Sequence, residues 1–225
     1  MDVIKQRMTE ELTGVKKLAL GPLVVPESVV VTWGIMILLV GLSILLTRRL
    51  REEKPGKAQP VLEWFVSFIN GFAQESLGEH GKAFAPYLGT IGLYIACANL
   101  SGLVGVTPPT KDLNVTAALS LMSMFLIYGS SFYFKGLKGG LHKFVEPMPL
   151  LLPINLMEVA IRPLSLCMRL FGNVLGSFVI MELIKILAPL IIPIPFSLYF
   201  DVFDGMIQTI VFVFLTTLFV AETIE

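Results

Sequence analysis

The sequence predicts an all-α, polytopic integral membrane protein with five transmembrane crossings and one further helix at the membrane surface. Hydrophobic residues make up 55% of the 225 residues and charged residues 15%, whereas about 25% of a soluble domain is charged. The mean hydropathy is +0.79. Apolar stretches of about twenty residues, the length that crosses the hydrocarbon core, recur along the chain. Disorder is excluded because it requires low hydrophobicity and high net charge.

The composition also argues against several classes of function. The 17 basic residues balance the 17 acidic residues, so no net field favours a nucleic-acid partner. Cys97 and Cys167 lie inside apolar runs and are expected to be small core residues, not a disulfide or a metal site. His80 and His142 lack the spacing of metal ligands. We expect no cofactor and no metal.

The first span is expected at residues 29–47, after an external segment of residues 1–28, and residues 29–225 are expected to form a single helical membrane domain. The span is too long for a signal peptide, and no small-residue cleavage site follows it. No transit segment precedes it, which favours a bacterial cytoplasmic membrane. Its basic flank indicates a cytoplasmic end, and hence an external N-terminus. This flank comprises Arg48, Arg49, Arg51, Lys54 and Lys57.

Residues 61–80 carry aromatic side chains at helical spacing, with polar residues mostly elsewhere. This pattern predicts a helix on the membrane surface, or an ordinary amphipathic helix packed on its own protein. Spans near 86–106 and 113–134 follow, separated by the polar loop TPPTKDLNVT. The fourth span is expected near 150–187 and the fifth near 197–221, so the C-terminus should be cytoplasmic.

The fourth span contains charges, each of which costs several kcal/mol inside a membrane. At about 100° per residue, six polar residues share one stripe of the helix: Glu158, Arg162, Ser165, Arg169, Asn173 and Ser177. Glu158 and Arg162 are an i, i+4 pair that can neutralise each other. Arg169 has no acid one turn away, and an arginine keeps its proton. It therefore needs an anion, either from Asp201 or Asp204 of this chain or from another chain.

Three motifs resemble the a subunit of the rotary F-type ATP synthase. The run PLSLCMRLFGN, residues 163–173, resembles the signature of that family. TPPTKDLNVT resembles the loop before the family's next span, and IQTIVFVFLTTLFV, which contains Gln208, resembles its last helix. The matches run in order from about Pro86 to the C-terminus. The resemblance implies a non-catalytic membrane subunit, and the chain contains no P-loop sequence for nucleotide chemistry.

In that family the arginine faces a rotating ring of c subunits, each with a carboxylate at mid-membrane. The resemblance implies that Arg169 attracts each carboxylate in its ionised form and stops ions from passing directly between two aqueous half-channels. Asn173 and Gln208 match family positions at the same interface, where Gln208 would help to hold the guanidinium. Ser177 continues the same polar stripe.

Asp201, Asp204 and Gln208 are spaced i, i+3, i+7 on the last span and are expected to line one half-channel. Alternatively, Asp201 only starts the helix, where an acid favours the N-terminal dipole. Some family members carry an acid nine residues after the arginine, where this chain has Phe178. Glu182 lies on a different face from the arginine, so we expect it to face another polar path or a neighbouring chain.

Four further residues match family positions with structural or access roles. Glu158 and Arg162 are expected to form a mainly structural ion pair. Asp112 and Asn114 match the external loop, where they either shape the outer access path or cap the following helix.

The function that the resemblance implies is ion translocation that drives ring rotation in ATP synthesis. The implied partners are the c-subunit ring, the b subunit of the peripheral stalk, the rest of the F1Fo complex and the lipid bilayer. The ion can be H⁺ or Na⁺, because the carboxylate that binds it belongs to the c subunit; H⁺ is the commoner choice in the family. Two other classes remain: a self-contained channel or secondary transporter, and a membrane scaffold with intramembrane ion pairs.

Overall fold

The computed structural model describes residues 17–20, 23–48, 59–142, 152–187 and 193–224. The chain divides into two compact units, each of which draws on several helices. The first unit comprises residues 1–41, 94–116 and 169–209, and the second unit comprises residues 42–93, 117–168 and 210–225.

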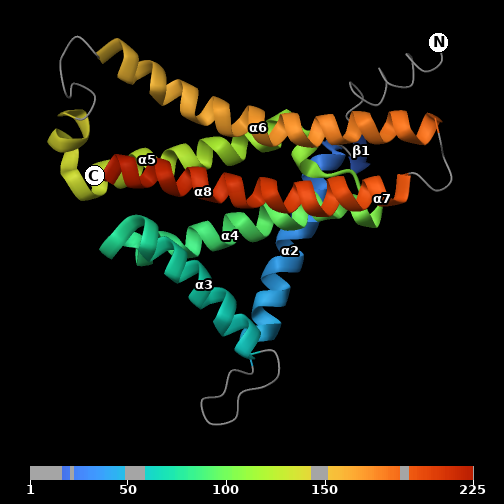
Figure 1. Ribbon diagram of the computed structural model, residues 1–225, viewed down its shortest axis with the longest axis horizontal. Coiled ribbons are helices and arrows are strands. Elements are labelled where there is room, and N and C mark those ends of the chain that lie inside the picture. Colours follow the sequence, from blue (N-terminus) through green and yellow to red (C-terminus); the bar gives the residue numbers. More distant parts are fainter. Residues whose placement is uncertain (1–16, 21–22, 49–58, 143–151, 188–192, 225) are drawn as a thin grey trace. The chain divides into compact units, whose positions relative to one another are not determined.

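The described residues contain five helical segments that are long and apolar enough to cross a membrane, which confirms the predicted all-α polytopic fold. Their main helices are α2 (Glu27–Thr47), α4 (Gly81–Leu100), α5 (Leu113–His142), α6 (Leu152–Leu187) and α8 (Gly205–Ile224), labelled in Figure 1. The second segment also includes α3 (Gln59–Leu77) and the short turn η1 (Gly78–His80). Large apolar side chains on the helices are exposed, as lipid-facing positions require.

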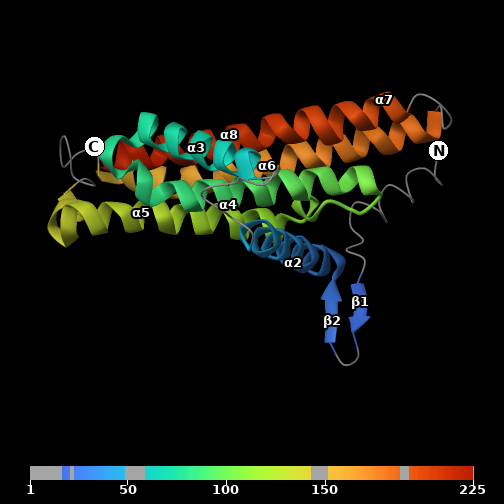
Figure 2. The ribbon, with the colours of Figure 1, turned by 90° about the horizontal axis from the view of Figure 1, so that it is seen from below.

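The first unit begins with a hairpin that the sequence analysis missed. Strand β1 (Lys17–Leu20) pairs antiparallel with β2 (Leu23–Pro26), as Figure 2 shows. Each strand has only four residues, the lower limit at which alternation indicates a strand, and the dipeptide Gly-Pro between the runs KLAL and LVVP is the turn signal that could have indicated the hairpin. The start of α2 follows and is tied to the rest of the unit by a hydrogen bond between the hydroxyls of Thr32 and Tyr94 at 3.1 Å.

Four short segments complete the first unit around the ends of α4, α6 and α8. The 3₁₀ turns η2 (Ser101–Val104) and η3 (Pro109–Lys111) lie in the loop between α4 and α5. The helix α7 (Pro193–Ser197) leads into the π-helical segment η5 (Leu198–Asp204), which continues as α8. The fifth span was expected to be a regular helix, so the π-helical segment is a difference from the prediction.

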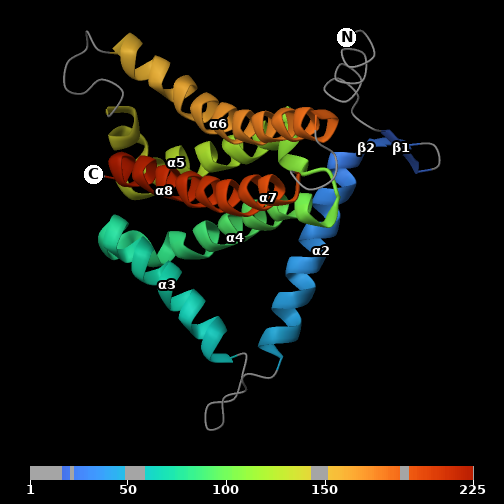
Figure 3. The ribbon, with the colours of Figure 1, turned by 45° about the vertical axis from the view of Figure 1, so that its right-hand side comes forward.

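The second unit has its apolar core where α3, α4, α5 and α8 meet. The buried residues of this core are Ala73, Phe84, Ala85, Leu88, Ile127 and Val220. α3 leads through η1 into α4, and the two helices diverge from this corner, as Figure 3 shows. Gly78 adopts φ = +59° at the corner, a conformation that glycine tolerates best. A part-buried hydrogen bond between Tyr87 and Ser123, at 3.0 Å, joins α4 to α5.

The close approach of α3 and α4 predicts that Gly81→Ala destabilises the subunit. A Cβ at Gly81 would overlap the carbonyl oxygen of Ala73 and lie 2.7 Å from the Cα of Gln74. These are backbone atoms, so we expect a loss of about 1–3 kcal/mol, as for other overpacked sites. Gly71→Ala is the matched control, because no atom lies within 4 Å of its Cβ position. Thermal unfolding of the detergent-purified complex measures both, and equal midpoints would contradict the prediction.

Candidate functional site

Arg169 lies on α6 with its side chain exposed. Within the described residues its guanidinium forms no hydrogen bond or ion pair. The sequence left open an ion pair with Asp201 or Asp204, and neither pair is formed. The Asp201 carboxylate accepts a hydrogen bond from Ser197 at 2.6 Å instead.

A cavity of about 550 Å³ lies in the first unit. Its walls come from the loop after α4, from the C-terminal part of α6 and from the segment α7–η5–α8. Its polar and aromatic lining residues include Asn99, Lys111, Ser177, Phe178, Asp201, Asp204 and Gln208. The structure therefore gathers the whole predicted face of the last span, together with Ser177 and Phe178, around one cavity.

The predicted polar face of the last span is not part of one regular α-helix. Asp201 and Asp204 belong to the π-helical segment η5, whereas Gln208 belongs to α8. All three still line the cavity. The alternative that Asp201 only starts the helix is wrong, because α7 begins at Pro193 and helical structure continues through Asp201. Asp204 lies 3.5 Å from the hydroxyl of Ser177 on α6.

Gln208 contacts α6 through Asn173. The amide of Asn173 donates to Oε1 of Gln208 at 2.6 Å. The family resemblance predicted that Gln208 would hold the guanidinium of Arg169, but no such contact is formed among the described residues. Gln208 bonds instead to Asn173, one turn further along α6. Gln208 is 3% exposed, and its Nε2 has no hydrogen-bond partner in the described part of the chain. This buried donor remains available to a group that enters the cavity.

Lys111 is a cavity residue that the sequence analysis missed. Its Nζ lies 3.2 Å from the centroid of the Phe178 ring, a cation–π contact between η3 and α6. The position at which some family members carry an acid is therefore an aromatic ring under an ammonium group. The two residues are far apart in sequence, so no local pattern could have indicated the contact.

Asp112 and Asn114 form the cap of α5, one of the two roles that the sequence left open. Oδ1 of Asp112 accepts hydrogen bonds from the backbone N–H and the side-chain amide of Asn114, at 3.0 and 3.1 Å. Its other oxygen accepts from the hydroxyl of Ser28 at 2.6 Å. Asp112 therefore caps α5 and fastens the start of α2 to the same loop.

Glu182 is neutralised within α6. Its carboxylate accepts a hydrogen bond from Lys185 at 2.8 Å, an i, i+3 pair. Lys185 lines the cavity, whereas Glu182 is absent from its lining. The expectation that Glu182 faces another polar path or a neighbouring chain stays a prediction.

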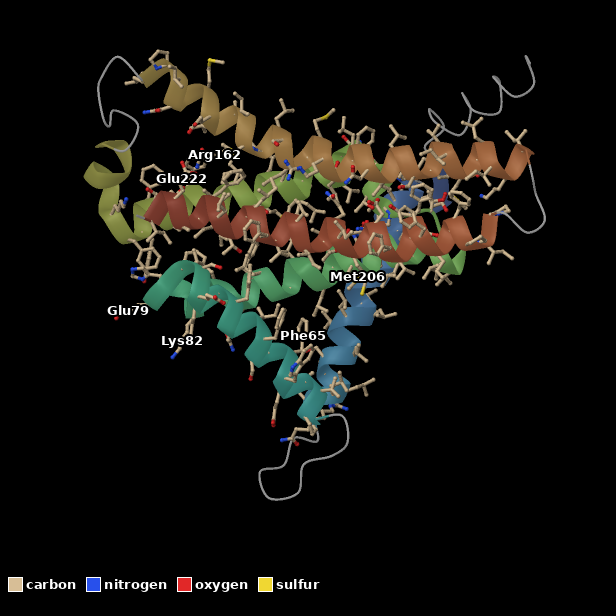
Figure 4. The ribbon with its side chains drawn as sticks, in the orientation of Figure 1. Phe65, Glu79, Lys82, Arg162, Met206 and Glu222 are labelled. Carbon is tan, nitrogen blue, oxygen red and sulfur yellow. The ribbon has the colours of Figure 1, made fainter. Side chains whose placement is uncertain are left out.

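The second unit holds a separate charge cluster around Arg162. Nη2 of Arg162 lies 3.0 Å from Glu158, the expected i, i+4 partner, and 2.5 Å from Glu222 of α8. The side chain of Arg162 is 13% exposed, whereas those of Glu158 and Glu222 are 53% and 51% exposed. Figure 4 shows Arg162 and Glu222 facing each other. The sequence predicted the first contact but not the second, because Glu222 lies 60 residues away on another helix.

Comparison with known proteins identifies the family. The family described as ATP synthase A chain matches residues 29–221. The chain belongs to this family. It is 37% identical over 207 residues to ATP synthase subunit a of Moorella thermoacetica, which covers 92% of this chain and 94% of that protein. It is 34% identical over 214 residues to ATP synthase subunit a 2 of a Bradyrhizobium species, with 95% of each chain covered.

A further relative carries an ion in its name. The chain is 32% identical over 213 residues to the sodium ion specific ATP synthase subunit a of Propionigenium modestum, with 88% of this chain and 73% of that protein covered. As an ATP synthase a subunit, the chain is a non-catalytic, multi-pass membrane subunit of the Fo sector. It associates with the rest of the F1Fo complex.

The cluster around Arg162 predicts unequal effects of its neutral variants. Arg162→Gln removes the cation that Glu158 and Glu222 share, whereas Glu158→Gln or Glu222→Gln leaves Arg162 with one of these two partners. Because the carboxylates are half exposed, we expect Arg162→Gln to cost only about 1–2 kcal/mol more than either acid variant. Thermal unfolding of the purified complex measures this difference. If Glu158→Gln assembled fully but abolished ion flow, Glu158 would belong to the ion path instead.

Proposed function

We propose that this a subunit is the ion-translocating stator of its ATP synthase, in which Arg169 faces the c-subunit ring. The observation that carries the proposal is the state of Arg169: it is exposed, and no described acid neutralises it. A charge inside a membrane requires a counter-ion. A carboxylate on a neighbouring c subunit supplies one without any rearrangement of this chain.

This arrangement couples ion flow to rotation through electrostatics. A fixed guanidinium favours the ionised form of a nearby carboxylate, so each ring carboxylate releases its ion as it approaches Arg169. The same charge repels cations and prevents an ion from crossing directly between the two half-channels. An ion must therefore board the ring on one side of Arg169 and leave it on the other. The neighbouring pair of Asn173 and Gln208 is neutral and polar, so it does not compete for the ring carboxylate.

The cavity of the first unit is the proposed outer half-channel. The carboxylates of Asp201 and Asp204 attract cations into the cavity. The side chain of Gln208 is neutral, so cations pass it without being trapped beside Arg169. The start of α2 is bonded to Asp112, next to the cavity residue Lys111. We propose that the N-terminus lies outside a bacterial cytoplasmic membrane and the C-terminus lies in the cytoplasm, which puts this cavity on the outer side. The b subunit of the peripheral stalk is the other proposed neighbour.

Replacement of Arg169 tests the central role. Lysine carries a compact charge that loses its proton readily on burial, so Arg169→Lys should assemble but fail in synthesis. Arg169→Ala should also let ions leak down the gradient. We expect synthesis in membrane vesicles to fall by about 100-fold or more, as when a fixed stabilising charge is removed from a reacting site. Arg162→Lys, which keeps a cation in its ion-paired cluster, is the matched control. Near-normal synthesis in either Arg169 variant would refute the proposal.

Asparagine at the two cavity acids tests the half-channel. Asn keeps a similar shape but cannot attract or relay a cation as a carboxylate does. We expect Asp201→Asn to leave the yield of complex intact and to slow ATP-driven ion pumping by up to about tenfold, with Asp204→Asn adding to the defect. The effect should shrink at high ionic strength. Glu75→Gln is the control, because that acid lies on α3 in the second unit and does not line the cavity. Unchanged pumping in both asparagine variants would remove this face from the ion path.

A further inference from the structure

Asn99 lies at the end of α4 and is almost completely buried, with 5% of its surface exposed. Its amide bonds to two other segments of the first unit. Nδ2 donates to the carbonyl of Gly205 at 3.1 Å, and Oδ1 accepts from the hydroxyl of Thr110 at 3.0 Å. We infer that Asn99 is a positioning residue that holds the π-helical segment η5 in register, and so directs the carboxylates of Asp201 and Asp204 into the cavity.

A π-helical turn needs support from outside, because its i→i+5 bonding is rare and persists mostly as single turns within α-helices. The N–H of Gly205 donates to the carbonyl of Phe200, five residues earlier, and so closes the turn. Asn99 bonds to the carbonyl of the same glycine, which also accepts from the hydroxyl of Thr209 at 2.9 Å. The C-terminal end of η5 is thus fixed by a side chain of another helix.

Two glycines allow this close approach. A Cβ at Gly205 would lie 2.9 Å from the Cβ of Asn99. A Cβ at Gly102 would lie 2.7 Å from Oδ1 of Asp201 and 3.0 Å from its Cγ. Asn99 and Gly102 are one helical turn apart along the chain, and so are Gly205 and Asp201. The end of α4 and the following turn η2 therefore approach the π-helical segment at Gly205 and at Asp201.

Register decides which side chains of η5 face the cavity. A turn closed by i→i+5 bonds holds one residue more than an α-helical turn. Suppose that η5 became α-helical while Gln208 kept its bond to Asn173. Asp201 would then turn about the helix axis by up to the angle that separates neighbouring residues, about 100°. Its carboxylate would then leave the position beside Gly102.

The same amide also fixes the basic side of the cavity. Thr110 is fully buried, and its hydroxyl bond to Asn99 anchors η3. The next residue is Lys111, whose ammonium lies on the ring of Phe178. Asn99 therefore positions Asp201 and Asp204 on η5, and Lys111 on η3, around one cavity. The importance of this arrangement for ion flow rests on the proposed function, whereas the positioning itself does not.

A disulfide reporter tests the positioning directly. Gly102→Cys with Asp201→Cys places the sulfur of residue 201 near the Cγ position of the aspartate, close enough to the new Cβ for a disulfide to form. Cys97 and Cys167 are first replaced by alanine. The initial rate of oxidative cross-linking is then measured in the assembled complex, with Asn99 intact and with Asn99→Leu, which keeps the branched shape but removes both hydrogen bonds.

We expect Asn99→Leu to slow cross-linking about tenfold, as the loss of buried hydrogen bonds predicts. Thr110→Val should slow cross-linking less than Asn99→Leu does, and Thr110→Ser, which keeps the hydroxyl, should cross-link at the parent rate. These milder variants also serve if Asn99→Leu does not assemble. Tyr87→Phe is the matched control, because it removes a single part-buried hydrogen bond in the second unit and should leave the rate unchanged.

The outcomes separate this inference from the proposed function. A cross-linking rate that is unchanged in Asn99→Leu and in Thr110→Val overturns the positioning role, whatever happens to ion pumping. Failure of the parent cysteine pair to cross-link overturns it as well. ATP-driven pumping is measured separately in the same Asn99 and Thr110 variants without the reporter cysteines. Slower cross-linking with normal pumping supports the positioning role and contradicts the proposed half-channel.

Discussion

A polar group inside the hydrocarbon core has no water to bond, so it must find its partner within protein. Many hydroxyls on the spans meet this constraint within their own helix, by donating to a carbonyl four residues earlier. These include Thr32, Thr90, Thr209, Thr217 and Thr223. Several amides, carboxylates and guanidiniums find partners on another helix, among them Arg162 with Glu222, Asn173 with Gln208 and Asn99 with Gly205. They therefore decide how the helices are joined.

The two arginines of α6 meet this constraint in opposite ways. Arg162 is mostly buried, bonds to two carboxylates and lies 5.2 Å from the ring of Phe219. Arg169 is exposed and has no counter-charge among the described residues. Both occupy the same polar stripe of one helix, so helical geometry alone does not distinguish them. The difference comes from α8, which supplies the carboxylate of Glu222 to Arg162. The contact of α8 with α6 at Asn173, one turn beyond Arg169, is made by the neutral amide of Gln208.

The sequence predicted the features that depend on neighbours along the chain. Hydropathy and length gave the first span as 29–47, and α2 is Glu27–Thr47. Helical spacing gave the pair of Glu158 and Arg162 and the common face of Asp201, Asp204 and Gln208, all of which the structure contains. These predictions succeed because a span and a helix face are set by residues within a few turns.

Features that depend on contacts between distant segments were not predictable. The pairing of Arg162 with Glu222 and of Lys111 with Phe178 requires knowledge of which helices are adjacent. The π-helical turn of η5 is also such a feature, since Asn99 of α4 supports it. Nothing in the sequence of the segment Leu198–Asp204 indicates a π-helical turn in place of an α-helical one.

Phe178 shows how one such contact redistributes the charges of the cavity. An aromatic ring attracts an ammonium by about 0.5–2 kcal/mol, which is much less than a carboxylate would at the same distance in a medium of low dielectric constant. An acid at position 178 would form an ion pair with Lys111 and cancel the charge of that lysine. With phenylalanine there, the acids among the lining residues are Asp201 and Asp204, both on η5. The attraction of the cavity for cations therefore depends on the one segment whose register Asn99 holds.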